Sequence, residues 1–201
     1  MTALPSEATG RLLTADEAIA RIKAGGVGVL PCDTVYGLVA SAHDPEAVAR
    51  LYALKRRNQK PGTIIAASVE QLVGLGFAAA DLAPAAKWWP NPLSVVLPAG
   101  EQLFYLHQGL ASLPVRIPKD ERVRAIVAQT GPLSTSSVNQ PGEPESVDMA
   151  MAWDYFGDSV DFYVDGGNLA GRAASTIVRF DAAGKAEVLR EGAIKASYLA
   201  S

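Results

Sequence analysis

The chain has 201 residues, of which 49% are hydrophobic and 19% are charged, and its formal net charge at pH 7 is −3. This composition is typical of a globular protein with a sizeable core. The negative net charge disfavours a protein that coats nucleic acid non-specifically and a protein that binds anionic membranes. Apolar runs end well before the roughly 18 residues of a membrane helix. The one cysteine, Cys32, excludes an internal disulfide and fits a reducing cytosol, so we expect a cytoplasmic protein.

Helices and strands alternate along the first half of the sequence. A capping box at Thr14 opens a helix that ends near residue 24, and a short apolar strand follows at 27–30. Asp44 begins the next helix, over 45–56, whose apolar residues recur at three- and four-residue spacing. The remaining elements of this half are a buried strand at 63–67, a helix after Ser68 and a helix over 81–89.

The second half continues the alternation and predicts one α/β domain. It contains helices over 120–129 and 146–156 and strands at 93–97, 113–117, 132–135, 160–164, 175–180 and 186–189. The last two strands form a hairpin. We therefore expect a twisted, mixed and largely parallel open sheet flanked by helices. No linker divides the chain, so the expected domain spans 12–198, behind a flexible N-terminal arm at 1–11.

Common catalytic motifs are missing from the sequence. The glycines of 25–28 precede a strand and fit neither a dinucleotide fingerprint nor a P-loop. With only His43 and His107 and no cysteine pair, a zinc site is disfavoured. The sequence has no Gly-x-Ser-x-Gly nucleophile elbow, so covalent catalysis by a serine is disfavoured. We expect no metal site built from protein side chains.

Polar tracts follow several predicted strands, where open α/β sheets place their ligands. The tracts lie at 33–36, 55–60, 114–118, 134–139, 166–176 and 189–192. Together they supply cations, hydroxyls and glycines, which indicates anion and nucleotide binding with catalysis by positioning and charge stabilisation. Taken singly, each has a structural explanation. A cationic helix end compensates the helix dipole, and Arg116, inside an apolar strand, faces either an internal acid or a ligand carboxylate.

The tracts match, in order, the motifs of a known family. The chain resembles the YrdC-like threonylcarbamoyl-AMP synthases over roughly residues 14–195. The matching motifs are Pro31 to Leu38, Lys55 with Arg57, Trp89 to Ser94, Val115 to Pro118, Ser136 to Pro144, Ser175 to Val178 and Arg190 to Gly192. The resemblance implies a YrdC-like fold and a nucleotidyltransferase that makes threonylcarbamoyl-AMP and pyrophosphate from L-threonine, bicarbonate and ATP for the t6A modification of tRNA.

The resemblance also implies roles for individual residues. Those implied to bind threonine are Thr34, Arg116 and Ser175, with Arg116 on the substrate carboxylate. Those implied to be catalytic and to contact the nucleotide are Lys55, Arg57, Ser137 and Asn139, and Arg190 is implied to bind the nucleotide as well. Mg²⁺ would be held mainly by the ATP phosphates. The implied further partners are tRNA or double-stranded RNA and a downstream threonylcarbamoyl transferase complex.

Several positions depart from the family pattern and leave alternatives open. Cys32 and Ser94 stand where Thr is usual, and Gly62 stands where Leu is common. A YciO-like paralogue has similar tracts but lacks the Ser-x-Asn loop that Ser137 and Asn139 form here. The other alternative is an RNA-binding module, in which the basic residues of these tracts form a concave surface that binds RNA and no reaction is catalysed.

Overall fold

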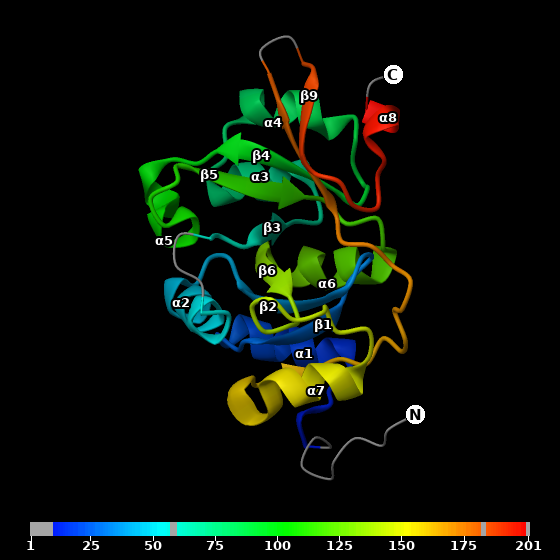
Figure 1. The fold of residues 1–201 in the computed structure, drawn as a ribbon. Coiled ribbons are helices and arrows are strands. Elements are labelled where there is room, and N and C mark those ends of the chain that lie inside the picture. The colour runs from blue at the N-terminus through cyan, green and yellow to red at the C-terminus, as the bar shows by residue number, and fades with distance from the viewer. Residues whose placement is uncertain (1–9, 57–59, 182–183, 200–201) are drawn as a thin grey trace.

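The computed structural model describes residues 10–56, 60–181 and 184–199, and one nine-stranded sheet runs through them (Figure 1). Its strand order is β7-β1-β2-β6-β3-β5-β4-β8-β9. The strands are β1 (Gly28–Pro31), β2 (Tyr36–Ser41), β3 (Thr63–Ile65), β4 (Leu93–Pro98), β5 (Ser112–Arg116), β6 (Leu133–Ser137), β7 (Phe162–Tyr163), β8 (Thr176–Phe180) and β9 (Ala186–Arg190).

Helices cover the sheet, and most of them begin at a side-chain cap. Thr14, Asp44, Ser68, Asp120 and Asp148 each accept a hydrogen bond from a backbone N–H in the first turn of a helix. The α-helices are α1 (Ala15–Lys23), α2 (Pro45–Leu54), α3 (Val69–Leu75), α4 (Ala79–Ala86), α5 (Phe104–His107), α6 (Glu121–Thr130), α7 (Met149–Phe156) and α8 (Ala196–Leu199). Two short 3₁₀ segments are η2 (Glu101–Leu103) and η3 (Gly157–Ser159).

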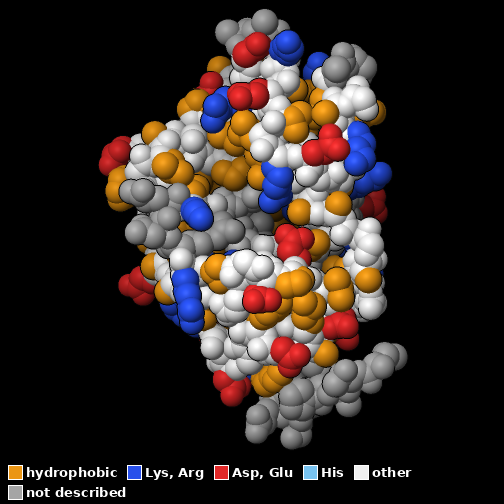
Figure 2. All heavy atoms as spheres, viewed as in Figure 1, with side chains coloured by type: hydrophobic (Ala, Val, Ile, Leu, Met, Phe, Trp, Pro, Cys, Tyr) orange, Lys and Arg blue, Asp and Glu red, His pale blue; other side chains and the backbone are white. Residues whose placement is uncertain are grey.

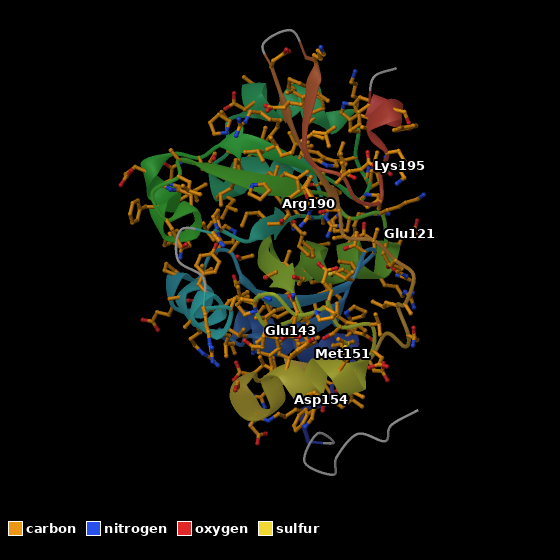
Figure 3. The ribbon with its side chains drawn as sticks, in the orientation of Figure 1. Glu121, Glu143, Met151, Asp154, Arg190 and Lys195 are labelled. Carbon is orange, nitrogen blue, oxygen red and sulfur yellow. The ribbon has the colours of Figure 1, made fainter. Side chains whose placement is uncertain are left out.

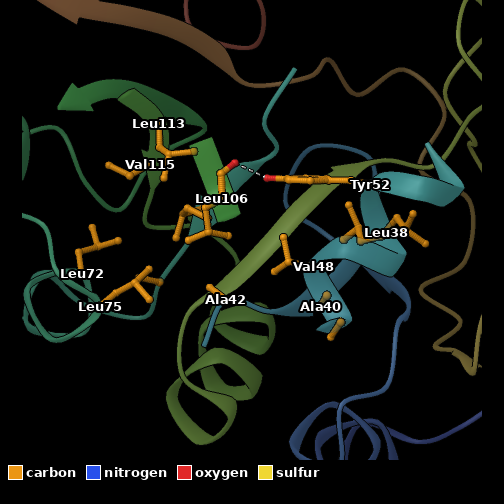
Figure 4. Packing of buried hydrophobic residues seen from close by; sticks show 14 of the residues in the cluster. Leu38, Ala40, Ala42, Val48, Tyr52, Leu72, Leu75, Leu106, Leu113 and Val115 are labelled. Atoms are coloured by element: carbon orange, nitrogen blue, oxygen red, sulfur yellow. Dashed lines mark hydrogen bonds between the residues drawn. The ribbon is translucent and has the colours of Figure 1, made fainter. Parts of the chain in front are cut away.

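The two faces of the sheet bury separate hydrophobic clusters. Successive strand residues point to opposite faces, so Leu38 joins one cluster and Val39 the other. The smaller cluster packs under α1 and α6. The larger one contains residues of α2, α3, α4, α5 and α7. In it, the Tyr52 hydroxyl donates to the Leu106 carbonyl at 2.8 Å, which ties α2 to α5 (Figure 4).

The expected mixed, helix-flanked sheet is confirmed, but the expected preponderance of parallel pairs is wrong. Five of the eight strand pairings in the described residues are antiparallel, and the parallel ones are β1–β7, β3–β5 and β4–β8. Two of the antiparallel pairings involve β2, a strand that the sequence analysis did not predict. Its first five residues are all buried, so it lacks the alternation that marks a half-exposed strand.

The expected N-terminal arm falls mostly on residues 1–9, which lie outside the described residues. Arg11, which we expected in that arm, donates to the Val160 carbonyl at 2.6 Å and to the Asp158 carboxylate at 3.1 Å. Leu12 forms a β-bridge with Tyr163. The chain is therefore attached to the sheet edge from Arg11 onward. Within the described residues, no helix combines the length and the hydropathy that a membrane span requires.

Candidate functional site

A cavity of about 80 Å³ lies near the middle of the sheet, where several strands end. Five of the predicted site residues line it: Thr34, Arg116, Ser137, Ser175 and Arg190. The other lining residues are Cys32, Val35, Tyr36, Gly37, Thr63, Thr135, Ser136, Glu145 and Ala174. Figure 2 shows a hollow at the centre of the visible face, with basic side chains above it and acidic ones below.

The strand register brings these side chains together. Arg116 is the last residue of β5 and Ser137 the last residue of β6, and both strands lie beside β3. The antiparallel pairing of β2 with β6 places Gly37 opposite Ser137, which brings the turn that carries Thr34 to the same place. Arg190 ends β9 at the base of the β8–β9 hairpin (Figure 3).

Arg116 is buried and faces an internal acid. Its Nη1 donates to Oδ1 of Asp33, and the two side chains are only 4% and 6% exposed. The other Asp33 oxygen, Oδ2, accepts a hydrogen bond from the backbone N–H of Lys119 at 2.8 Å. The Nε of Arg116 is buried and has no hydrogen-bond partner among the described residues. The internal acid is therefore present, and one buried donor of this cavity-lining arginine, Nε, still lacks a partner among the described residues.

A buried hydroxyl pair supports the opposite wall. Ser175 Oγ lies 3.0 Å from Ser94 Oγ, and Arg190 Nη2 donates to the Ser175 carbonyl at 2.7 Å and to its Oγ at 3.3 Å. Burial lowers the pKa of Arg190 below its ordinary value, Glu145 opposes that shift, and Arg116 adds to it. The two arginines thus sense each other's charge at the cavity, which favours an anion between them.

Lys55 lies beside the cavity and not on its wall. It is the C-cap of α2 and is 4% exposed. Its Nζ donates to the carbonyls of Ser137 and Asn139 and to Asn139 Oδ1, the last at 2.7 Å. Ser137 Oγ also donates to Asn139 Oδ1, at 2.8 Å. The predicted contact of Lys55 with a nucleotide stays a prediction, and Arg57 lies outside the described residues.

The sequence interpretation missed several residues at this site. Burial raises the pKa of the Cys32 thiol to about 12, so at neutral pH the wall carries a neutral thiol. Tyr36 accepts from the Gly166 N–H at 2.9 Å and donates to the Gly167 carbonyl at 2.8 Å, which fixes the glycine-rich loop after β7. Glu145 sits in an irregular segment where no pattern distinguishes it, whereas Asp33 and Tyr36 lie inside a tract that the sequence had already singled out.

The site offers little to hold a metal ion directly. No group of three or more His, Cys, Asp or Glu side chains suited to a metal occurs in the described parts of the chain. The acid on the cavity wall is Glu145, and Asp33 is engaged by Arg116 and Lys119. This donor set fits an Mg²⁺ ion held mainly by a ligand's phosphates and by water, with at most one carboxylate from the protein.

Comparisons with known proteins identify relatives of this chain. A model of the Sua5, YciO and YrdC proteins, described as telomere recombination, matches residues 20–192. A threonylcarbamoyl-AMP synthase of Chromohalobacter salexigens is 35% identical over 168 residues, which cover 81% of this chain and 90% of that protein.

Two solved structures are also similar. Pyrococcus abyssi Sua5 in complex with L-threonine has a TM-score of 0.79 and 30% identity, over 89% of this chain and 54% of the Sua5 chain. This chain thus spans about half of that longer protein. Escherichia coli YciO has a TM-score of 0.78 at 19% identity, over 98% of this chain and 95% of its own, and so shows the shared fold alone. Since the family match spans most of the sequence, the chain belongs to the Sua5/YciO/YrdC family.

Proposed function

We propose that the protein is an L-threonylcarbamoyladenylate synthase. It forms threonylcarbamoyl-AMP and pyrophosphate from L-threonine, bicarbonate and ATP. The observation that carries this proposal is the guanidinium of Arg116, buried at the cavity wall with its Nε unpartnered. A buried donor without a partner is costly, and a substrate carboxylate offers what it lacks.

The cavity suits the amino-acid substrate. About 80 Å³ is far below the roughly 300–1,000 Å³ of pockets for drug-sized ligands, so the space fits a small polar molecule and not a whole nucleotide. Threonine would place its carboxylate at Arg116 and its hydroxyl and amine among the polar groups of Thr34 and Ser175. These hydroxyls and the arginine come from three different strand ends, which fixes the substrate's orientation.

The nucleotide would lie at the mouth of the cavity, beside Ser137, Asn139 and Arg190. The threonine amine would add to the carbon of bicarbonate, and the carbamate would form with loss of water. A carbamate oxygen would then attack the α-phosphorus, and pyrophosphate would leave. Arg190 and the cationic segment at 55–60 would offset the charge that develops on the phosphates. Mg²⁺ would shield the triphosphate when bound.

The loop after β6 favours the synthase over a YciO-like paralogue. Ser137 and Asn139 are joined by a hydrogen bond, and Lys55 holds both of their carbonyls. This arrangement keeps the Ser-x-Asn loop, which such a paralogue lacks, in one conformation at the cavity mouth. We propose that the product serves tRNA modification in the cytoplasm through a downstream transferase.

The test is pyrophosphate release by the purified protein with ATP and Mg²⁺. We expect release only when L-threonine and bicarbonate are both present, together with a product of the mass of threonylcarbamoyl-AMP that incorporates labelled bicarbonate. ATP consumption that ignores threonine would contradict the proposal. RNA binding without any turnover would instead support the RNA-binding alternative.

Two arginines of the same hairpin provide a matched pair of variants for this assay. Arg190 lines the cavity, whereas Arg179 is exposed and pairs with Glu187 on the outside of the β8–β9 hairpin. Arg190→Ala should abolish most of the threonine-dependent release, and Arg179→Ala should leave it within about twofold of the wild type, as for a surface ion pair. Equal effects of the two changes would show that the cavity is not the reaction site.

A further inference from the structure

We propose that Asp33 is a positioning residue, which holds the guanidinium of Arg116 by Nη1 so that its Nε edge stays unpaired and can receive the substrate carboxylate. The inference rests on the proposed function, because it concerns how the same cavity recognises an amino acid. It assigns a role to a residue that forms an internal ion pair and that does not contact the substrate.

Asp33 and Arg116 line different hollows of the protein. Arg116 is on the wall of the central cavity. Asp33 is not among the described residues of that wall and instead lines a separate recess with Pro92, Lys119, Asp120 and Arg172. The carboxylate therefore approaches the guanidinium from behind, as seen from the cavity, so a ligand in the cavity meets the arginine and not the aspartate.

The Asp33 carboxylate is itself fixed from two directions. Oδ1 accepts from Arg116 Nη1, and Oδ2 accepts from the backbone N–H of Lys119 at 2.8 Å. Lys119 directly precedes Asp120, the N-cap of α6, so this donor belongs to a well-defined helix start. A carboxylate bound on both oxygens cannot rotate freely, and it passes that constraint to the guanidinium.

The charge and donor pattern then leave one edge of Arg116 for a ligand. Nη1 is occupied by Asp33, while Nε is buried and unpartnered among the described residues. A planar guanidinium can receive a second carboxylate along its Nε edge while the first stays on Nη1. Asp33 also balances the buried positive charge of Arg116, which would otherwise be strongly unfavourable.

The two separate donors determine which substitution tests the role. Asp33→Asn keeps the shape of the side chain, but an amide has one acceptor oxygen for the two donors, so either Lys119 or Arg116 loses its partner. Asp33→Glu keeps the charge and both acceptors but moves them by one methylene. It therefore preserves charge balance while displacing the guanidinium.

The experiment measures L-threonine binding to the purified protein by calorimetry, without ATP, and the KM values for threonine and ATP. We expect Asp33→Asn and Asp33→Glu each to weaken threonine binding on the order of tenfold, about 1.4 kcal/mol. The KM for ATP should stay within about twofold, since no ATP contact is removed. A matched control is Asp161→Asn, which disrupts the Asp161–Arg50 pair away from the cavity and should leave threonine binding unchanged.

A double-mutant cycle with Arg116→Lys separates positioning from a general structural effect. If Asp33 acts through Arg116, Asp33→Asn should have little further effect on threonine binding once Arg116 is Lys. Additive losses, or wild-type threonine affinity in both Asp33 variants, would overturn the inference. No threonine binding by the wild type would instead remove the proposed function, and this inference with it.

Discussion

The Nζ of Lys55 lies 2.7 Å from Oδ1 of Asn139, although 84 residues separate the two in the chain. The same ammonium group donates to the carbonyls of Ser137 and Asn139, and it is almost completely buried. One cation at the end of α2 therefore satisfies three acceptors of the loop that follows β6. The cationic helix end does more than compensate a helix dipole, because it holds the loop that begins at Ser137, a residue of the cavity wall.

Lys55→Met should destabilise this loop and the protein. Two backbone carbonyls and a side-chain amide lose a charged donor, which costs about 1–3 kcal/mol. At about 2–4 °C per kcal/mol for a chain of this size, Tm should fall by several degrees. Amide exchange at 137–146 should accelerate, and nucleotide affinity should fall more than threonine affinity. Lys23→Met, on the last turn of α1, is the control, and unchanged exchange in Lys55→Met would refute the loop-holding role.

Arg116→Lys should separate the structural from the functional role of that arginine. Lysine keeps a cation for Asp33 but has neither Nε nor a planar fork. Threonine affinity should fall by about 1.5–3 kcal/mol, the usual range for a hydrogen bond to a charged group. The KM for threonine and the thermal stability are measured together. Normal threonine dependence with a lowered Tm would mean that Arg116 serves only its ion pair with Asp33.

Local signals in the sequence were sufficient for most of the helices. The caps at Thr14, Asp44 and Ser68 begin helices where the structure has them, because a cap and its helix are neighbours in the chain. By contrast, β2 and the four-residue helices α5 and α8 were missed. A fully buried strand has no alternation, and a single helical turn is too short for a periodic pattern.

In the candidate site, too, features that depend on neighbouring residues were predictable, and a contact between residues far apart in the chain was not. Position after a predicted strand singled out the tracts that contain Thr34, Ser137 and Arg190, and the family resemblance then pointed to these residues, which do line the cavity. The partner of Arg116 was not predictable, because Asp33 is 83 residues away and either an internal acid or a ligand would satisfy a buried arginine. Only the register of the sheet, which brings the end of β5 close to the turn after β1, decides between them.

Alkaline pH should destabilise the protein through buried acids at the cavity. Burial raises the pKa of Cys32 from 9.0 to about 12 and that of Tyr36 from 10.0 to about 12. The folded state thus holds these protons more tightly than the unfolded chain. Their contribution to stability is complete below pH 9 and is lost as the pH rises toward 12.

Cys32→Ala removes one of these two groups and tests the effect. The Tm of the wild type should fall between pH 9 and 11, and the Tm of Cys32→Ala should fall less. At the alkaline end, the loss in the free energy of unfolding should be smaller in Cys32→Ala by on the order of 2 kcal/mol. Comparing each protein with its own Tm at pH 7 cancels the packing cost of the substitution. Parallel pH profiles for the two proteins would show that the thiol does not titrate at a raised pKa.

Ser94→Ala should weaken threonine use although Ser94 is fully buried behind the cavity. Its Oγ lies 3.0 Å from that of Ser175, whose carbonyl and hydroxyl are also held by Arg190. Without Ser94 the Ser175 hydroxyl has one partner fewer and a choice of rotamers. A neutral hydrogen bond contributes about 0.5–1.5 kcal/mol, which corresponds to a roughly 2–10-fold higher KM for threonine. Ser94→Thr keeps the hydroxyl and restores the family's usual residue, so its KM should stay near that of the wild type. If Ser94→Ala and Ser94→Thr raise the KM equally, packing around the altered side chain, and not the hydroxyl pair, controls the position of Ser175.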